Sequence, residues 1–549
     1  MDSPDSIIRK HAIRNAHEYG EANPGKVVGK VVNELPGAKK DMKALMGKIA
    51  AICKEVNALP RGELEKEFAK LPEKERKEEK SEIEIPDAVP GKVVVRFPPE
   101  PNGYPHIGHA KAFALSWTIA RKYNGKAILR WDDTNPEAEK PEFVDAIRNG
   151  IKWLGLDWDD EKYCSDYMPE MYRLCEKLLW EGNAYACSCT QDEIGKGREM
   201  KERCACGSRT PQESLDEWKK MLNGATPEGG ATVRLRGDME SLNTVMRDPT
   251  LFRIMEAPHY RQGLKYRAWP TYDFQGAVMD SLLGITHPIR SKEYELRDEL
   301  YSFLLERLGM RVPKMISISR LSIRNAPLSK RLLRPLVEEG KVMGWDDPRL
   351  PTLEGLRRRG IVPDAIRKFV LSFGISKVES EPGWDKLLAE NRKILDPIAP
   401  HYFFVPNPAR VRIEGGKKKK LREMECRGEV WISGQDASGL EEGETIRLKD
   451  LYNVKVGKTG DTIEASYAGD EVGSGKKLQW VSEKLECEVL RPGNLVLDSG
   501  EFNPSSLTID AGYCEKSIHS LKEGDMVQFE RYGFCRLDSR KPLRFVYSC

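Results

Sequence analysis

Apolar residues recur every three or four positions in two stretches of the first 60 residues, as they do along one face of a helix. The breaker Asn23-Pro24-Gly25 lies within this region and is expected to separate two helices. Residues 61–84 are dominated by Lys and Glu, which favours a solvated helix or a flexible linker. These patterns predict a small helical appendage that ends near residue 88.

Beyond that boundary, strand patterns alternate with helix patterns. The β-branched run at 92–97 indicates a buried strand, and the apolar run at 127–131 indicates a second one. Each run is followed by a breaker-rich turn and then by an amphipathic helix, the second of which starts after Pro141. This alternation predicts an α/β fold with a parallel sheet.

The pattern changes further along the chain. Residues 167–270 interrupt the alternation and carry four clustered cysteines, so we expect an insertion there. Near the C-terminus, short runs of alternating apolar and polar residues separated by turn residues predict β-barrels rather than more α/β sheet. The predicted segments are 1–88, 89–166, 167–270, 271–335, 336–400 (helical) and 401–549.

Composition excludes several classes of protein. At 549 residues the chain is too long for one small module, so we expect several domains. The 89 Lys and Arg residues nearly balance the 86 Asp and Glu residues, so any surface for nucleic acid must be local. No apolar run approaches the roughly 18 residues of a spanning helix, and the first residues are too charged for a secretory signal. We therefore expect a cytoplasmic protein that makes no membrane contact.

Two short motifs carry the strongest chemical signal. His106-Ile107-Gly108-His109 lies where a loop enters a helix, so two imidazoles and the unpaired helix amides can converge on an anion. Gly108 lets a nucleotide approach the backbone closely. One alternative is that one histidine caps the helix and the other is incidental. Pro327-Leu328-Ser329-Lys330-Arg331 is a basic loop before a later helix, and alone it would indicate only a solvated charge run.

Together the two motifs resemble the paired HIGH and KMSKS signatures of class I aminoacyl-tRNA synthetases. The N-terminal helices resemble the appendage of archaeal glutamyl-tRNA synthetases. Leu328 stands where the loop motif commonly has Met, a side chain of similar size. The resemblance to the glutamyl and glutaminyl branch covers nearly the whole chain and includes Arg96–Gly103, Asp132–Pro136, Tyr272–Phe274, Gly284–His287 and Trp345–Arg349.

This resemblance implies a multidomain enzyme. Its parts would be an α/β Rossmann-like catalytic domain with an acceptor-stem-binding insertion, a helical N-terminal appendage, a helical connecting domain and C-terminal anticodon-binding β-barrels. The implied activity is that of a glutamate–tRNA ligase, which activates L-glutamate with ATP and transfers it to the 3′ end of tRNA. The implied partners are therefore ATP with Mg²⁺, L-glutamate and tRNA. The alternatives are a glutaminyl-tRNA synthetase and a non-catalytic tRNA-binding paralogue.

The resemblance also implies roles for individual residues in activation. Negative charge builds on a pentacoordinate phosphorus during this step, and preorganised donors aimed at it are the natural catalyst. His106, His109 and Lys330 would supply them, with Mg²⁺ bridging the phosphates. The residues implied to bind ATP are His106, Gly108, His109, Arg320, Ser329, Lys330 and Arg331.

Glutamate carries two carboxylates and one ammonium, so a specific site needs both cations and an anion. By resemblance, Asp132 would hold the ammonium, whereas Arg96 and Tyr272 would hold carboxylate oxygens. For Asp132, the alternative is a helix-capping role after a strand.

Arg290 is the residue that separates the two specificities. The resemblance places it where glutamyl enzymes carry the arginine that binds the substrate side chain and where glutaminyl enzymes have an uncharged residue. A planar guanidinium pairs bidentately with a carboxylate but offers an amide only half a partner. The rival interpretation is a surface salt bridge from Arg290 to Glu293 or Glu295.

The clustered cysteines have the composition of a metal site. Cys187 and Cys189 form one pair, Cys204 and Cys206 form the other, and four thiolates suffice for a closed tetrahedral zinc site. Each pair has one residue between its cysteines, which is a closer spacing than the two to four residues usual in zinc sites. The alternative to a zinc site is therefore four reduced cysteines with a structural role. The other eight cysteines are scattered, and we expect them to be packing residues.

Two local basic clusters, Arg357–Arg359 and Lys417–Lys420, are candidates for RNA contact, although a charge run is usually solvated surface. The resemblance favours the C-terminal β-barrels for anticodon recognition, because unstacked bases of an RNA loop can stack on aromatic side chains.

Overall fold

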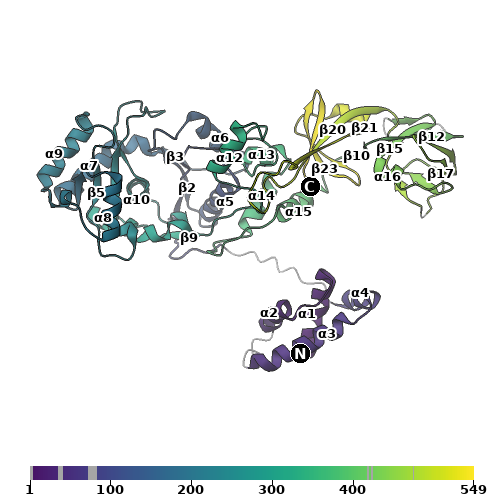
Figure 1. The fold of residues 1–549 in the computed structure, drawn as a ribbon, viewed down its shortest axis with the longest axis horizontal. Coiled ribbons are helices and arrows are strands. Elements are labelled where there is room, and N and C mark those ends of the chain that lie inside the picture. The colour runs from purple at the N-terminus through teal and green to yellow at the C-terminus, as the bar shows by residue number, and fades with distance from the viewer. Residues whose placement is uncertain (1–3, 35–40, 72–82, 417–418, 422–423, 474) are drawn as a thin grey trace. The chain divides into compact units, whose positions relative to one another are not determined.

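Two compact units make up the protein, Met1–Glu82 and Ile83–Cys549 (Figure 1). The computed structural model describes all residues except 1–3, 35–40, 72–82, 417–418, 422–423 and 474. The central part of the predicted Lys- and Glu-rich linker therefore lies outside the described residues.

The first unit is helical. Pro24 of the predicted breaker occupies the first position of its helix, where the missing amide hydrogen costs nothing. Apolar side chains such as Ile8, Val27 and Ile49 pack into one small core. The helices are α1 (Pro4–Tyr19), α2 (Pro24–Glu34), α3 (Met42–Asn57) and α4 (Arg61–Lys70).

Short parallel strands form the centre of the second unit. β1 (Val94–Phe97), β2 (Lys126–Trp131) and β3 (Asp160–Tyr163) pair in that order, and β8 (Ile289–Ser291) pairs with β9 (Ile316–Ile318). Just before β8, the amide of Thr286 donates to the carbonyl oxygen of Val94 at 2.8 Å. This bond connects the two groups of parallel strands.

Helices cover these strands and share one core with them. Apolar residues of β1 and β2 pack with the buried face of α5, and the later helices α13 to α15 bring further apolar residues to the same cluster. This core therefore extends from the parallel strands into the segment 353–387. The helices are α5 (Ile107–Lys122), α6 (Pro141–Trp153), α12 (Lys330–Glu338), α13 (Leu353–Arg358), α14 (Pro363–Leu371) and α15 (Trp384–Leu395).

An antiparallel sheet interrupts the parallel strands where the sequence predicts an insertion. Its order is β4-β5-β6-β7, and it has a core of its own around Trp218, Phe252 and Trp269. Helices α10 and α11 follow the sheet and pack into this core. The elements are α7 (Met168–Trp180), β4 (Ala184–Cys187), α8 (Gln191–Met200), α9 (Pro211–Asn223), β5 (Thr232–Leu235), β6 (Thr250–Ile254), β7 (Ala268–Pro270), α10 (Tyr272–Leu282) and α11 (Asp298–Leu308).

The C-terminal part consists of two curled sheets. The chain passes directly from one edge strand of the larger sheet, β10 (His401–Tyr402), to its other edge strand, β11 (Phe404–Pro406). The inner strands of this seven-stranded sheet, in spatial order, are β22 (Met526–Phe529), β23 (Gly533–Arg540), β24 (Leu543–Tyr547), β20 (Lys484–Pro492) and β21 (Leu507–Glu515).

The smaller sheet has six strands, and a bridge between Trp431 and Val481 links its first strand to the chain just after its last. The predicted barrels are thus present as two curled half-barrels. The six strands, in spatial order, are β15 (Glu429–Ile432), β12 (Ala409–Glu414), β18 (Thr462–Tyr467), β17 (Asn453–Lys458), β16 (Thr445–Leu448) and β19 (Lys477–Leu478). The remaining elements are β13 (Lys419–Leu421), β14 (Met424–Cys426) and α16 (Gly434–Ser438).

Arg358 and Arg359 of the first predicted basic cluster contact other segments of the chain, whereas Arg357 is exposed. Arg358 bonds both carboxylate oxygens of Asp538 at 2.9 Å. Arg359 is 4% exposed and lies against the ring of Trp384. The predicted RNA contact is therefore wrong for Arg359, which is buried. Arg358 is already paired with Asp538. In the second cluster, residues 417–418 lie outside the described residues.

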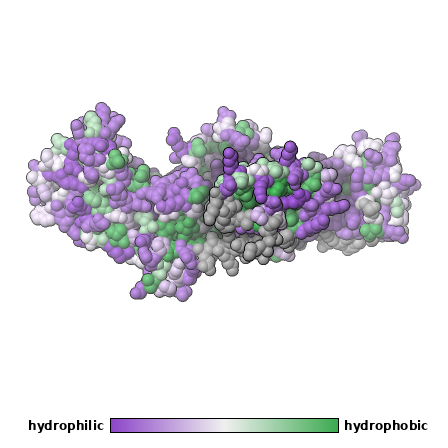
Figure 2. Space-filling model, turned by 90° about the horizontal axis from the view of Figure 1, so that it is seen from below, coloured by the Kyte–Doolittle hydropathy of each residue, from purple (hydrophilic) through white to green (hydrophobic). Residues whose placement is uncertain are grey.

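The face shown in Figure 2 is mostly hydrophilic, with apolar side chains scattered across it. Among the described residues, no helix is both long enough and apolar enough to cross a membrane.

Candidate active site

A cavity of about 1000 Å³ opens at the carboxyl ends of β1, β2 and β8, beside the start of α5. Ligands of parallel α/β sheets typically bind at this edge. Of the predicted loop residues, Ser329, Lys330 and Arg331 are not among the lining residues that the structure describes, although Leu328 is. The structure does bring together in the lining Arg96, His106, Gly108, His109, Asp132, Tyr272, Arg290 and Arg320.

Both histidines of the first motif cap α5. His106 Nδ1 accepts a hydrogen bond from the amide of Gly108 at 3.1 Å, and His109 Nδ1 accepts one from the amide of His106 at 3.2 Å. A Cβ at Gly108 would lie 2.9 Å from His106 Cε1, so glycine lets the ring fold back onto the helix. The alternative of a helix-capping histidine therefore describes the bonds of Nδ1. Both histidines make such a bond, not one alone.

Capping also fixes the tautomer. Because Nδ1 accepts a bond in each ring, the proton of the neutral imidazole sits on Nε2. Among the described residues neither Nε2 has a hydrogen-bond partner, and both rings line the cavity. Protein atoms around the rings lower the pKa of His109 to about 4, and burial, His109 and Arg320 lower the pKa of His106 well below its usual value. Both rings are thus neutral Nε2 donors at physiological pH.

Lys330 is the first residue of α12, and Ser329 is its N-cap. The Lys330 ammonium donates to the carbonyl oxygen of Asn102 and lies 5.0 Å from the centroid of the Phe143 ring. Burial, followed by the charge of a neighbouring arginine, lowers the pKa of Lys330. Arg331 is exposed. The basic loop therefore touches the loop that precedes the histidine motif, but its lysine lies outside the cavity wall.

A chain of buried ion pairs lies beneath the cavity. Arg96 Nε and Arg130 Nη1 both donate to Asp280 Oδ1, at 2.8 and 2.6 Å. Arg130 also binds Asp132 through both carboxylate oxygens, at 2.7 and 3.0 Å, and Gln275 donates to the same carboxylate at 3.0 Å. These partners of Asp132 are side chains and not the helix amides of a cap. The network orients the carboxylate of Asp132 at the cavity wall.

Arg290 is 7% exposed and lies among aromatic rings. Its guanidinium carbon is 5.4, 5.3 and 5.5 Å from the ring centroids of Tyr272, Tyr294 and Tyr301. Its Nη1 is 3.4 Å from Asp298 Oδ1, a long bond, and its buried Nε has no partner among the described residues. A desolvated cation with an unpaired donor at a cavity wall is suited to an incoming carboxylate.

The rival salt bridge for Arg290 is wrong. Glu293 pairs instead with Arg320 at 3.2 Å, and Glu295 pairs with Lys377. Both of these pairs are exposed, whereas Arg290 is buried. The position of Arg290 is therefore not explained by either glutamate.

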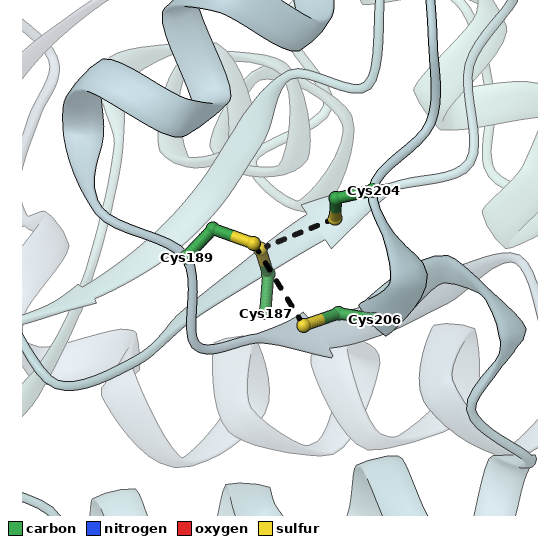
Figure 3. A group of neighbouring side chains, drawn as sticks. All are labelled: Cys187, Cys189, Cys204 and Cys206. Carbon is green, nitrogen blue, oxygen red and sulfur yellow. Dashed lines mark hydrogen bonds between the residues drawn. The ribbon is translucent and has the colours of Figure 1, made fainter.

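The four clustered cysteines converge at the end of β4 and in the 3₁₀ helix η3 (Ala205–Ser208) beside it (Figure 3). Their sulfur atoms all lie within 4.8 Å of one another. Cys187 Sγ is 3.7 Å from Cys204 Sγ, and Cys189 Sγ is 3.9 Å from Cys206 Sγ. Burial raises the pKa of Cys187. Burial opposes ionisation of Cys204 too, but bonds from neighbouring thiols and a nearby arginine outweigh it and lower that pKa.

Comparison with known proteins identifies the family. A model described as the catalytic domain of class I (E and Q) tRNA synthetases matches residues 92–397. Two models described as anti-codon binding domains of class I (E and Q) tRNA synthetases match residues 399–468 and 477–538. The chain belongs to the class I (E and Q) tRNA synthetases.

Several archaeal proteins match this class I synthetase over nearly its full length. A "Glutamate--tRNA ligase" of Nitrosopumilus maritimus is 43% identical over 562 residues, with 98% of both chains covered. One from Pyrococcus furiosus is 39% identical, with 97% of both chains covered. A crystal structure of a glutamate tRNA ligase from Elizabethkingia meningosepticum aligns with 56% of this chain and 70% of its own, at 21% identity and a TM-score of 0.42.

The synthetase has site residues that sequence reasoning missed. Lys111 lines the cavity, and its ammonium donates to the carbonyl oxygen and hydroxyl of Ser319 at 2.8 and 3.0 Å; burial lowers its pKa to about 8. Arg130 and Asp280 were missed as well. The sequence did contain a signal for these residues, because each is a charged residue within an otherwise apolar run. Such residues are seldom buried without a partner, so each could have been expected to pair with another polar group. Cys164, expected only to pack, accepts a bond from Gln275.

Proposed function

We propose that the chain is a glutamate–tRNA ligase that activates L-glutamate with ATP and transfers the glutamyl group to the 3′ end of tRNA. The observation that carries this proposal is Arg290, a buried cation with an unpaired donor at the wall of the cavity. Curated relatives that match nearly the whole chain bear the same name. As an enzyme of protein synthesis it would work in the cytoplasm.

In activation, an oxygen of the glutamate α-carboxylate forms a bond to the α-phosphorus of ATP, and the bond to pyrophosphate breaks. We propose that His106 and His109 donate from Nε2 to the phosphate oxygens on which charge accumulates. Lys330 would leave Asn102 to join them, with Arg320, Ser329 and Arg331 as further contacts and Gly108 lying under the nucleotide. Bound with the nucleotide, Mg²⁺ would neutralise part of the phosphate charge.

For the amino acid, the proposed contacts follow the charges of glutamate. Arg290 would take the side-chain carboxylate, while Arg96 and Tyr272 would take oxygens of the α-carboxylate. Asp132 would accept from the ammonium through Oδ2, which among the described residues accepts one bond, from Arg130 Nη2, and so keeps a lone pair free. The sites for glutamate and ATP then meet at the carboxyl ends of the parallel strands.

The domain roles are also part of the proposal. The strands β1, β2 and β3 pair in parallel, as do β8 and β9, and together with the bond from Thr286 to Val94 this pairing supports the proposal of a Rossmann-like catalytic domain. The antiparallel insertion would contact the acceptor stem of the tRNA, the helical segment would connect the domains, and the two half-barrels would read the anticodon. The domain boundaries are those predicted above.

We further propose that the four cysteines hold a structural zinc ion. A tetrahedron with zinc–sulfur bonds of about 2.3 Å has edges of about 3.8 Å. The separations of Cys187 from Cys204 and of Cys189 from Cys206, 3.7 and 3.9 Å between sulfur atoms, fit that edge. Arg234 Nη1 lies 3.5 Å from Cys204 Sγ and would offset part of the excess negative charge.

Metal analysis of the purified chain tests this site. We expect about one zinc per chain after washing with a weak chelator, and loss of zinc together with a lower melting temperature in Cys206→Ser. Cys175→Ser, which removes a buried thiol outside the cluster, is the matched control and keeps its zinc. Native protein that is fully active, stable and free of metal contradicts the proposal.

Charging assays with both amino acids on purified tRNA for glutamate and for glutamine test the function. We expect ATP-dependent formation of glutamyl-tRNA on the tRNA for glutamate and no significant charging with glutamine, because an amide leaves a buried cation unpaired. Preferential charging with glutamine would identify a glutaminyl-tRNA synthetase. Binding of tRNA without charging by either amino acid would identify a non-catalytic paralogue.

A further inference from the structure

The turn that carries Asp132 lacks regular secondary structure, yet it is buried. Residues 132–135 follow β2 without helix or strand, and Asp132, Asp133 and Thr134 are each at most 6% exposed. Asp132 is the only carboxylate in the proposed glutamate contacts, so its position depends on what holds this turn. The inference that follows rests on the proposed function and extends it.

One side of the turn is held through the side chain of Asp133. Its carboxylate accepts bonds from the amide and hydroxyl of Ser165, at 2.8 and 2.7 Å. The hydroxyl of Tyr260 adds a third bond at 3.3 Å, and Arg261 lies 3.9 Å away. Asp133 therefore anchors the turn to the segments after β3 and before β7.

The other side is held through main-chain atoms. His259 Nε2 lies 3.2 Å from the carbonyl oxygen of Asp133, and Glu139 Oε1 accepts from the amide of Asn135 at 2.8 Å. His259 and Glu139 also meet, with Nε2 and Oε2 3.3 Å apart. Both side chains are almost completely buried, at 2% and 4% exposed. Two buried groups, one from a distant segment and one four residues beyond the turn, thus bond adjacent peptides of the turn.

The tautomer of His259 supports this arrangement. Its Nδ1 accepts bonds from the amides of Arg261 and Gln262, at 3.1 and 3.0 Å. The ring proton therefore sits on Nε2, where it is donated to Asp133. Burial, followed by competing hydrogen bonds, leaves the pKa of Glu139 raised to about 8. Glu139 thus acts mainly as a hydrogen-bonding group rather than as a charge.

We propose that His259 and Glu139 are positioning residues for the glutamate site: together they hold the main chain of the turn, so that Asp132 presents its carboxylate to the substrate ammonium. Neither residue touches the substrate, and neither lines the cavity in the described part of the chain. Losing either grip lets Asp132 move relative to the cavity, whereas the ATP contacts on α5 and α12 are unaffected.

The test uses the full chain in the aminoacylation reaction, with KM measured separately for glutamate and ATP. We expect His259→Asn, which withdraws the donor, to raise KM for glutamate on the order of tenfold while KM for ATP changes less than about twofold. His259→Gln keeps an amide donor near Nε2 and is expected to recover most of the loss. Glu139→Leu should act like His259→Asn, and Glu139→Gln should resemble the native protein.

A matched control removes a buried imidazole elsewhere. His287 is 4% exposed, and its Nε2 bonds the carbonyl oxygen of Pro86 at 2.9 Å. His287→Asn is expected to lower the melting temperature without changing the ratio of the two KM values. If Glu139→Leu fails to fold, the comparison of His259→Asn with His259→Gln tests the positioning role by itself.

Two results would overturn the positioning role. One is an unchanged KM for glutamate in His259→Asn, and the other is an equal rise of both KM values, which indicates only general damage. Failure of the native protein to charge glutamate would be seen before any variant is made, and it would count against the proposed function instead.

Discussion

Replacing His109 or Lys330 with alanine is expected to slow formation of glutamyl-adenylate by about 10²–10³-fold while the chain stays folded. In the proposed mechanism each residue donates to a phosphate on which charge develops, His109 from its fixed ring and Lys330 after leaving Asn102. His109 does so from Nε2, because its Nδ1 is already occupied by the amide of His106. Lys330 is held beside the site by the carbonyl oxygen of Asn102. Single-turnover measurement of adenylate formation gives the effect directly.

Conservative and neighbouring variants separate this role from folding. His109→Gln keeps an amide donor close to Nε2, and we expect it to recover part of the rate. Arg334 lies one turn after Lys330 on α12 and pairs with Glu338 at 2.6 Å on the exposed surface. Arg334→Ala is therefore expected to leave activation unchanged. A native single-turnover rate in His109→Ala or Lys330→Ala would remove that residue from the proposed mechanism.

The parts of the site that could be predicted from sequence are those set by local signals. The run at 92–97 contains β1, and α5 begins directly after His106, because β-branched residues and a capping motif act within a few positions. The class I synthetase resemblance, carried by two short motifs, is confirmed by the family models. Local patterns thus located the elements and the loops that line the cavity.

The partners of buried charges could not be read from the sequence. Arg130 pairs with Asp280 across 150 positions, and no periodicity connects them. The rival interpretation of Arg290 paired it with Glu293 or Glu295, whereas in the fold its ion pair is with Asp298. Arg359 looked like part of a solvated cluster because burial depends on what packs over a helix end. In each case the deciding contact depends on how the folded chain packs and not on a local sequence pattern.

Arg290 is expected to determine the choice of glutamate over glutamine. Glutamate and glutamine have nearly the same volume, so the shape of the site contributes little to discrimination. The cost arises when an amide enters and leaves the guanidinium without its ionic partner, and a stranded charge of this kind costs about 2–4 kcal/mol. The guanidinium is well placed for that role, because it is buried beside three tyrosine rings at the cavity wall and its Nε is unpaired among the described residues.

Measuring kcat/KM for both amino acids with Arg290→Ala and Arg290→Gln tests this role. We expect the ratio of glutamate to glutamine to fall by roughly 10²-fold or more in each, through loss of activity with glutamate. Asp298→Asn is the matched control, since it removes the only carboxylate that pairs with Arg290 among the described residues. If the main role of Arg290 were its ion pair with Asp298, the variants at Arg290 and at Asp298 would all lose stability. Their ratio of kcat/KM for glutamate to glutamine would then stay at the native value. A preserved ratio in Arg290→Ala and Arg290→Gln would move specificity to another cavity residue, with Arg96 as the next cation to test.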